Sequence, residues 1–171
     1  MNVGVRPARR EDAAQIARIY NQGIEDRVAT FETRFRTAHD IERWFDAGFP
    51  VVVAGENEGP ITGWAAAPPY RPERDAYRGV AEFSVYVDRA SRGQGVGRVL
   101  MQELMAESAR RGLWKLVSRI FRENEASLAL CRAAGFREVG VYKRHARLDG
   151  AWKDCVIVER LLGDGEVEPP G

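Results

Sequence analysis

The sequence predicts an α/β protein of the α+β type, with a mixed central sheet of about seven strands flanked by about four helices. Apolar stripes at helical spacing alternate along the chain with short apolar runs that are typical of strands. Turn signals bound those runs, among them Asn-Glu-Gly-Pro at 57–60 and Asp149–Gly150. With 171 residues, the chain is long enough for one well-buried core, so we expect a single domain over 1–163.

The first half of the chain predicts one strand, two helices and a hairpin, in that order. A strand over 3–8 precedes a helix over 10–26, whose apolar residues recur at helical spacing. Thr37 and Asp40 have the spacing of a capping box, which predicts a second helix of about ten residues. That helix ends near Gly48. The hairpin strands that follow cover 51–56 and 61–67.

The second half alternates strands and helices before a final hairpin. A loop over 68–79 that is rich in proline and arginine leads into a single alternating strand over 80–87. Gly112 and Gly135 predict the ends of two helices, and Asn124 is a candidate N-cap of the second. The remaining predicted elements are helices over 96–112 and 124–135 and strands over 114–121, 137–148 and 151–162. We expect the tail over 164–171 to be disordered.

Composition argues against several classes of partner. The net charge is only +1 with 30% charged residues, which favours small anions over nucleic acid or an anionic membrane. Neither a secretory signal nor a membrane-spanning run is evident, so we expect a cytoplasmic protein. Cys131 and Cys155 cannot form a disulfide framework, and His39 and His145 have no zinc-site spacing, so we expect no metal.

The turn after the predicted strand over 80–87 contains Gly93, Gly95 and Gly97 directly before a helix. Such a junction offers free backbone N–H groups and a positive helix end, which together bind anions; a tight turn with positive φ is the alternative explanation. A P-loop is excluded, because Arg98 follows where it needs lysine and then serine or threonine. The glycine spacing also differs from that of a dinucleotide-binding fingerprint.

The pattern Arg92-x-x-Gly95-x-Gly97 instead resembles the pyrophosphate-binding loop of the GNAT superfamily of acetyl-CoA-dependent N-acetyltransferases. The strand before the loop and the helix from Asn124 to Gly135-Phe136 also resemble that superfamily, so the likeness covers about 80–140. The stretches at 29–32, 76–87 and 145–160 are most similar to the subfamily that acetylates phosphinothricin, methionine sulfoximine and arsinothricin. The resemblance implies a mostly antiparallel sheet and acetyl-CoA as cosubstrate.

The resemblance also implies which residues bind acetyl-CoA. The pantetheine arm would pair with the strand that ends at Val87, where a backbone N–H near Val85 to Val87 would stabilise the oxyanion. Amides of the glycine loop would hold the pyrophosphate, and the Arg92 side chain would add charge-assisted bonds. Asn124 would contact pantetheine, cap its helix, or do both. The candidate residues are Val85, Tyr86, Val87, Arg92, Gly93, Gln94, Gly95, Val96, Gly97, Arg98, Asn124 and Ser127.

Two residues are candidates for proton transfer. Glu82 is in the strand before the loop, where the resembled family has its base; a solvated strand glutamate is the alternative. Cys131 occupies a helical position at which the family usually has tyrosine or histidine. It would either protonate the leaving thiolate or serve as a small buried packing residue, so the general acid stays open.

An acceptor of the glutamate-analogue type carries anionic groups that planar cations recognise. Arg71 and Arg74 lie in the loop before the catalytic strand, and Tyr70 and Tyr77 beside them could donate hydrogen bonds; a solvated polar loop is the alternative. Phe31 resembles the family's acceptor-wall aromatic residue but could equally belong to the core. Thr30, Glu82 and His145 complete the candidate acceptor residues.

Three further expectations concern assembly and activity. Trp64, Trp114 and Trp152 are predicted core or subunit-interface residues, and the resemblance implies a homodimer. The expected reaction is acetylation of the α-amine of a small toxic amino acid, which confers resistance. The alternatives are an acetyltransferase for methionine sulfoximine or sulfone, for another metabolite amine or for a protein N-terminus, and an acyl-CoA-binding module without turnover.

Overall fold

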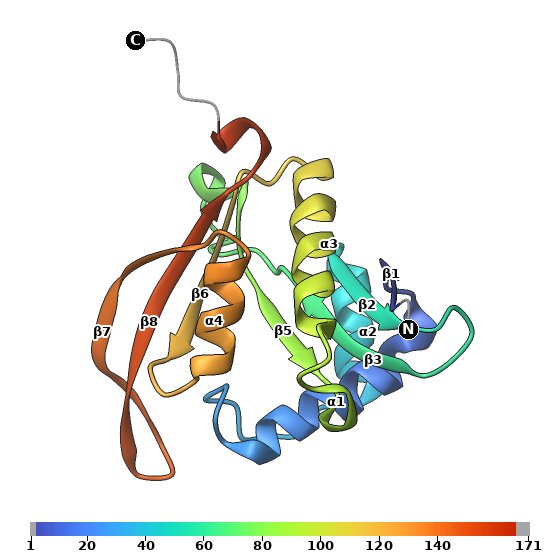
Figure 1. Ribbon diagram of the computed structural model, residues 1–171. Coiled ribbons are helices and arrows are strands. Elements are labelled where there is room, and N and C mark those ends of the chain that lie inside the picture. Colours follow the sequence, from blue (N-terminus) through green and yellow to red (C-terminus); the bar gives the residue numbers. More distant parts are fainter. Residues whose placement is uncertain (1–2, 167–171) are drawn as a thin grey trace.

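The computed structural model describes residues 3–166, which form two four-stranded sheets and four α-helices (Figure 1). The first sheet contains β1 (Gly4–Pro7), β2 (Val51–Gly55), β3 (Ile61–Ala66) and β5 (Ser84–Val87), in that order. The second has the order β4 (Val80–Glu82), β6 (Lys115–Phe121), β8 (Ala151–Leu161) and β7 (Arg137–Leu148). The helices are α1 (Ala13–Asp26), α2 (Ala38–Ala47), α3 (Val96–Arg110) and α4 (Glu125–Ala133). The predicted fold class is confirmed.

The predicted number of strands was too low, because the single strand expected over 80–87 is two strands. β4 pairs in parallel with β6, whereas β5 pairs antiparallel with β3 in the other sheet. The break falls at Phe83, whose N–H donates to the carbonyl of Val117 at 3.0 Å. Phe83 itself is buried against Phe136, with ring centroids 4.9 Å apart. The continuous segment over 80–87 therefore crosses from one sheet to the other.

Helix ends follow the predicted capping residues. The Thr37 hydroxyl accepts a bond from the Asp40 N–H, and Asp40 accepts one from the Thr37 N–H, which confirms the capping box before α2. Gly48 ends that helix with φ +77°, and Asn124 caps α4 by accepting from the N–H of Ser127. The first helix begins later than predicted, because residues 10–12 form a separate 3-10 turn.

The core has two layers on opposite faces of the first sheet. Along β2, Val51 and Val53 pack with α1 and α2, whereas Val52 and Ala54 pack with α3. The α3 layer continues under α4 on one face of the second sheet. Trp64 is buried in the layer of α1 and α2, as predicted for a core residue.

Trp152, unlike Trp64, lies at the surface. It is 49% exposed and packs under the Arg147 guanidinium. The tail predicted over 164–171 starts inside the 3-10 turn Gly163–Glu166, and 167–171 lie outside the described residues. Within residues 3–166, no helix combines the length and apolar character needed to cross a membrane.

Candidate active site

The two sheets separate between β5 and β6 and leave a wedge-shaped cleft. At its narrow end, the Ser118 hydroxyl donates to the Phe83 carbonyl at 3.0 Å. Beyond this point β5 pairs only with β3, and the outer half of β6 pairs only with β8. Two strand edges with free backbone groups therefore face each other across the cleft.

The direction of the backbone groups along β5 follows from its pairing. Asp88 donates its N–H to the Thr62 carbonyl on the β3 side at 2.8 Å. Because backbone groups of successive residues alternate between the two sides of a strand, Tyr86 also bonds toward β3. Val85 and Val87 consequently direct their N–H and C=O groups toward the cleft. Val85, Tyr86 and Val87 are the candidate cosubstrate-binding residues of this strand. Two of them, Val85 and Val87, therefore direct backbone groups toward a ligand in the cleft.

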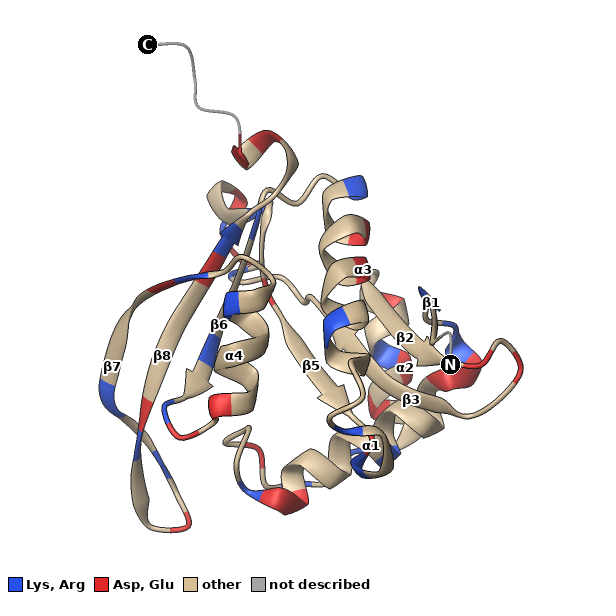
Figure 2. Ribbon diagram, in the orientation of Figure 1, with Lys and Arg blue, Asp and Glu red and all other residues tan. Residues whose placement is uncertain are grey.

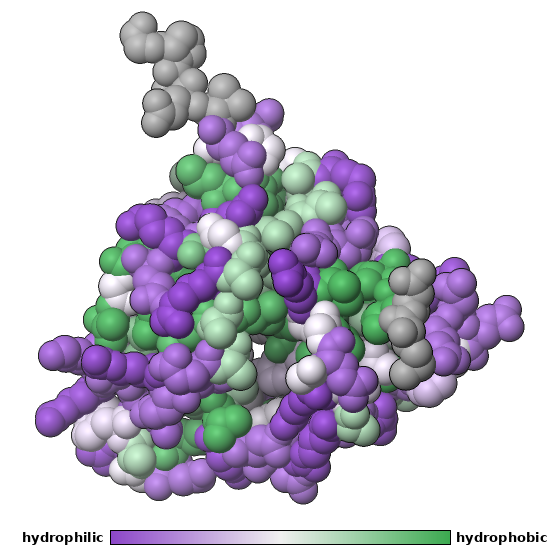
Figure 3. Space-filling model, in the orientation of Figure 1, coloured by the Kyte–Doolittle hydropathy of each residue, from purple (hydrophilic) through white to green (hydrophobic). Residues whose placement is uncertain are grey.

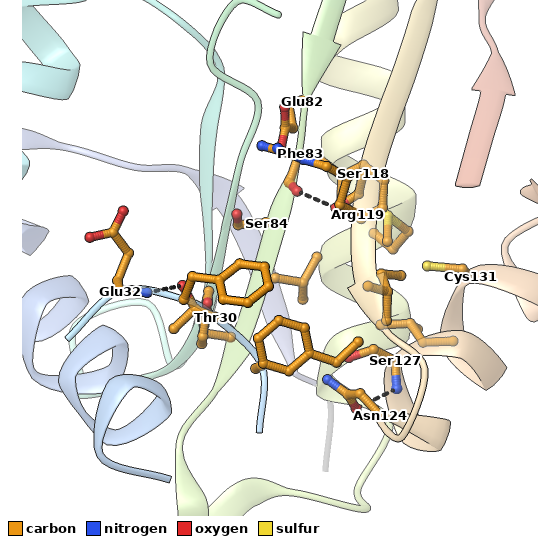
Figure 4. Close-up of a pocket in the computed structure, with 18 of the residues that line it drawn as sticks. Thr30, Glu32, Glu82, Phe83, Ser84, Ser118, Arg119, Asn124, Ser127 and Cys131 are labelled. Atoms are coloured by element: carbon orange, nitrogen blue, oxygen red, sulfur yellow. Dashed lines mark hydrogen bonds and ion pairs between the residues drawn. The ribbon is translucent and has the colours of Figure 1, made fainter. Parts of the chain in front are cut away.

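The cleft has a volume of about 310 Å³ and is visible as a hollow between α4 and the turn before α3 (Figure 3). Glu82 lies at its narrow end, and Asn124 and Ser127 lie at the other (Figure 4). The remaining lining residues are Tyr20, Ala29, Thr30, Phe31, Glu32, Phe83, Ser84, Val85, Tyr86, Met101, Ser118, Arg119, Ile120, Phe121, Leu130 and Cys131.

The glycine loop follows β5 directly and ends at the start of α3. Gly93 and Gly95 have φ +74° and +82°, and no heavy atom lies within 4 Å of where a Cβ would stand. Gly95 is the N-cap of α3 and provides no side-chain cap, so the first N–H groups of the helix stay available to an anion. Gly97 serves packing, because a Cβ there would lie 3.2 Å from Leu130.

Arg92 is tied to α1 in this structure. Its Nη2 donates to Oδ2 of Asp26 at 2.8 Å, and its Nε donates to the Val87 carbonyl at 3.3 Å. Arg89 binds the same carboxylate, and the charged residues of the loop and of α1 lie side by side in Figure 2. Burial opposes ionisation of Asp26, but the hydrogen bonds from Arg89 and Arg92 outweigh it and lower the pKa of this carboxyl.

Glu82 forms an ion pair with Arg119 of β6. Oε1 of Glu82 accepts from Nη2 at 2.7 Å and from Nε at 3.0 Å. The side chains are 29% and 50% exposed, respectively. Glu82 is thus a partly exposed carboxylate with a specific cation beside it.

Cys131 lies on α4 at the back of the cleft and belongs to the buried core. Burial raises the pKa of its thiol to about 12. A free cysteine thiol has an ordinary pKa of about 8.5, so Cys131 holds its proton much more firmly than a solvated thiol would. This environment favours the packing role over the acid role.

The predicted acceptor residues are divided between two cavities. Thr30 and Phe31 line the cleft, where Phe31 packs against Phe121 with ring centroids 4.7 Å apart. A second cavity of about 730 Å³ lies on the face of the second sheet that α4 does not cover, and its lining includes Tyr70, Arg71, Tyr77 and His145. Arg74 lines neither cavity.

Glu82, Ser118 and Arg119 line both cavities and so mark the place where they meet. No role was predicted for Ser118 or Arg119 from the sequence. A strand, a helix and a second strand over 80–121 predict a parallel pair, and that pairing would have placed Arg119 close to Glu82. The register confirms it, because Glu82 stands opposite Val117.

A cleft between two separating strands, a glycine turn beyond it and a carboxylate at its narrow end define the class of this protein. The model of the acetyltransferase (GNAT) family matches residues 16–136, and the chain belongs to this family. The predicted resemblance is therefore confirmed.

Individual members of the family match nearly the whole chain. The chain is 37% identical to the phosphinothricin N-acetyltransferase of Alcaligenes faecalis, over 97% of this chain and 86% of that protein. It is 31% identical to the L-methionine sulfoximine/L-methionine sulfone acetyltransferase of Pseudomonas paraeruginosa, over 95% and 96%. A crystal structure of a phosphinothricin acetyltransferase from Sinorhizobium meliloti in complex with acetyl-CoA superposes with a TM-score of 0.90. That chain is 31% identical, and the match covers all of this chain and 94% of the other.

Proposed function

We propose that this protein transfers the acetyl group of acetyl-CoA to the α-amine of a small toxic amino acid that is an analogue of glutamate, of the phosphinothricin or arsinothricin type. Acetylation removes the charge of the amine and would confer resistance. The names of the relatives support this substrate class and equally include methionine sulfoximine and sulfone. Those two compounds, or another metabolite amine, are the alternative acceptors.

The observation that carries the proposal is the pair of open strand edges beside an uncapped helix start. Pantetheine has amide groups that can pair with the backbone of Val85 and with the N–H of Val87, and the cleft between β5 and β6 is of a size to admit it. The N–H groups at the start of α3 would hold the diphosphate, since Gly95 leaves them uncapped. The described residues therefore fit the cosubstrate.

The reaction forms a C–N bond and breaks the C–S bond of the thioester. Glu82 takes the proton that the α-ammonium must lose before its nitrogen can attack, either directly or through one water. The N–H of Val85 stabilises the oxyanion that develops on the thioester carbonyl. The thiolate leaves and takes a proton. Because Cys131 holds its proton so firmly, we assign it to packing and the final proton to solvent that reaches the cleft.

Release of free thiol from acetyl-CoA tests the proposal. Phosphinothricin, arsinothricin, methionine sulfoximine, methionine sulfone and ordinary amino acids form the panel. We expect turnover with one of the anionic analogues and a fall of kcat on the order of 10²- to 10⁴-fold in Glu82→Gln, without loss of acetyl-CoA affinity. A protein that binds acetyl-CoA but acetylates no member of the panel is a binding module, and this result would overturn the proposal.

The assembly that we propose is a homodimer in the cytoplasm. β7 is an edge strand of its sheet, and Val139, Val141 and Tyr142 on it are 47%, 42% and 51% exposed. A second copy of the chain would cover this apolar edge. Sedimentation should detect a dimer at micromolar concentration and a monomer for Val141→Lys. A monomeric wild-type chain would contradict this assignment.

A further inference from the structure

The ion pair between Glu82 and Arg119 leaves one side of each group free. Arg119 donates from Nε and Nη2, both to Oε1 of Glu82. Among the described residues, nothing hydrogen-bonds to Oε2 of Glu82 or to Nη1 of Arg119. A carboxylate oxygen and a guanidinium amino group are therefore both available to a ligand at this point.

This arrangement is complementary to the common part of every free amino acid. An α-amino acid carries an ammonium and a carboxylate on the same carbon atom, so its two charges are a few bonds apart. The base takes the proton of the ammonium directly or through one water, so it lies near the ammonium. The α-carboxylate then lies close to the residue next to the base. At Glu82 that neighbour is Arg119, with Nη2 only 2.7 Å from the carboxylate.

We propose that Arg119 binds the α-carboxylate of the acceptor while Glu82 receives the proton of its ammonium group. The proposal rests on the proposed function and makes it more specific. Arg119 would be a substrate-binding residue that selects acceptors with a free α-carboxylate. A peptide N-terminus has an amide at that place and offers the guanidinium no charged partner.

The neighbouring cations are less available for this task. Lys115 is paired with Glu159 at 3.1 Å, and the Arg71 guanidinium packs over the rings of Tyr70 and Tyr77 at 5.4 and 6.0 Å. Arg119 lines both cavities, so an acceptor in either one can reach it. Arg71 is then left for the anionic head group, which lies farther from the amine.

The test compares the best amino acid of the acceptor panel with its α-carboxamide, which has the same side chain but no α-carboxylate charge. Wild type, Arg119→Gln, Arg119→Lys and Arg122→Gln are measured with both compounds at saturating acetyl-CoA. Arg122 is a matched control, because it is 61% exposed and lies near Asp154 rather than Glu82.

For the amino acid, we expect Arg119→Gln to raise KM on the order of ten- to a hundredfold, and Arg119→Lys to restore part of the loss. For the carboxamide, the same substitution should change KM less than about threefold, since no charged bond is lost. Arg122→Gln should behave as wild type with both compounds.

Two results would overturn the inference while leaving the proposed function intact. One is a wild-type enzyme that acetylates the amino acid and the carboxamide with equal kcat/KM. The other is an Arg119→Gln variant that loses the same factor with both compounds, which would mean that Arg119 only positions Glu82. Failure of the proposed function is distinguishable, because no acceptor would then be acetylated by the wild type.

Discussion

Arg92 donates a hydrogen bond from Nη2 to Oδ2 of Asp26 at 2.8 Å, so the last residue of α1 holds the arginine of the glycine loop. The chain continues from Asp26 into the segment that carries Thr30 and Phe31 at the cleft. One carboxylate thus links the loop expected to bind the diphosphate with the wall expected to contact the acceptor.

Replacing Asp26 by Asn should tighten acetyl-CoA binding. The substitution removes a negative charge beside an anion site and frees Arg92, while the amide oxygen can still accept hydrogen bonds from the loop. We expect a Kd lower by about two- to fivefold at low salt, in keeping with the strength of partly exposed ion pairs, and a smaller effect at high salt. Isothermal titration calorimetry at both salt concentrations measures this Kd.

Glu25→Gln is the control for Asp26→Asn, because Glu25 pairs with Arg89 but not with Arg92. The acetyl-CoA affinity of Glu25→Gln should stay near that of the wild type. Weaker binding by Asp26→Asn would instead mean that the loop needs the charged pair to keep its shape.

Gly95→Ala should weaken acetyl-CoA binding beyond its effect on stability. With φ +82°, an alanine at 95 costs about 1–2 kcal/mol of folding free energy, and its methyl group stands where the diphosphate would approach the backbone. We expect a Kd about tenfold higher for this variant, measured by calorimetry.

Gly48→Ala is the matched control for this loop. Gly48 has φ +77° and equally open surroundings, but it ends α2 instead of starting α3. Its stability should fall by a similar amount in urea unfolding, whereas its acetyl-CoA affinity should not change. An equal loss of affinity in both variants would argue that Gly95 serves the fold alone.

Cys131→Ala should change kcat less than about threefold. Burial gives the Cys131 thiol a pKa of about 12, so it is a poor proton donor to a thiolate of lower pKa. Cys155→Ala, at a buried cysteine outside the cleft lining, serves as the control. A fall of kcat on the order of a hundredfold or more for Cys131→Ala alone would identify Cys131 as the general acid.

Asp12→Asn should destabilise the fold in a pH-dependent manner. The Asp12 carboxylate is only 7% exposed and accepts bonds from Arg6 at 2.8 and 2.9 Å and from the Arg9 N–H at 2.7 Å. Burial opposes its ionisation, but these hydrogen bonds outweigh burial and lower the pKa of the carboxyl. We expect a loss of about 2–3 kcal/mol at neutral pH, measured by urea unfolding.

The sign of the pH effect follows from the lowered pKa of Asp12. Its stabilisation is complete above the ordinary aspartate pKa of about 3.9 and is lost as the pH falls below it, so the two proteins should converge in stability at lower pH. Asp46→Asn, at an exposed carboxylate paired with Arg10, should cost less than about 1 kcal/mol. A pH-independent difference between wild type and Asp12→Asn would contradict the ion-pair explanation.

Local sequence signals were sufficient to predict those features that are built from residues close together in the chain. The capping box of Thr37 and Asp40, the cap at Asn124 and the glycine turn all depend on backbone groups a few positions away. The break at Phe83 was missed because an alternating strand pattern does not encode which strand each half will pair with. Arg74 was predicted to contact the acceptor but lines neither cavity, because its position depends on how an exposed loop folds over the sheet.

The Glu82–Arg119 pair was missed for a different reason. The two residues are far apart in the sequence, and only the parallel register of β4 and β6 brings them together. The fold class and most elements were therefore predictable, whereas the strand register that brings Glu82 and Arg119 together within the second sheet was not.

The separation of the two sheets at Phe83 has a consequence for the rigidity of the protein. Among residues 3–166, hydrogen bonds join the segment of β5 to β6 only at Phe83. A thioester arm bound between β5 and β6 would therefore act as an additional strand that links them along the cleft. Cosubstrate would then slow amide exchange at Val85 and Val87, and the enzyme would become a stiffer body each time it loads its acyl donor.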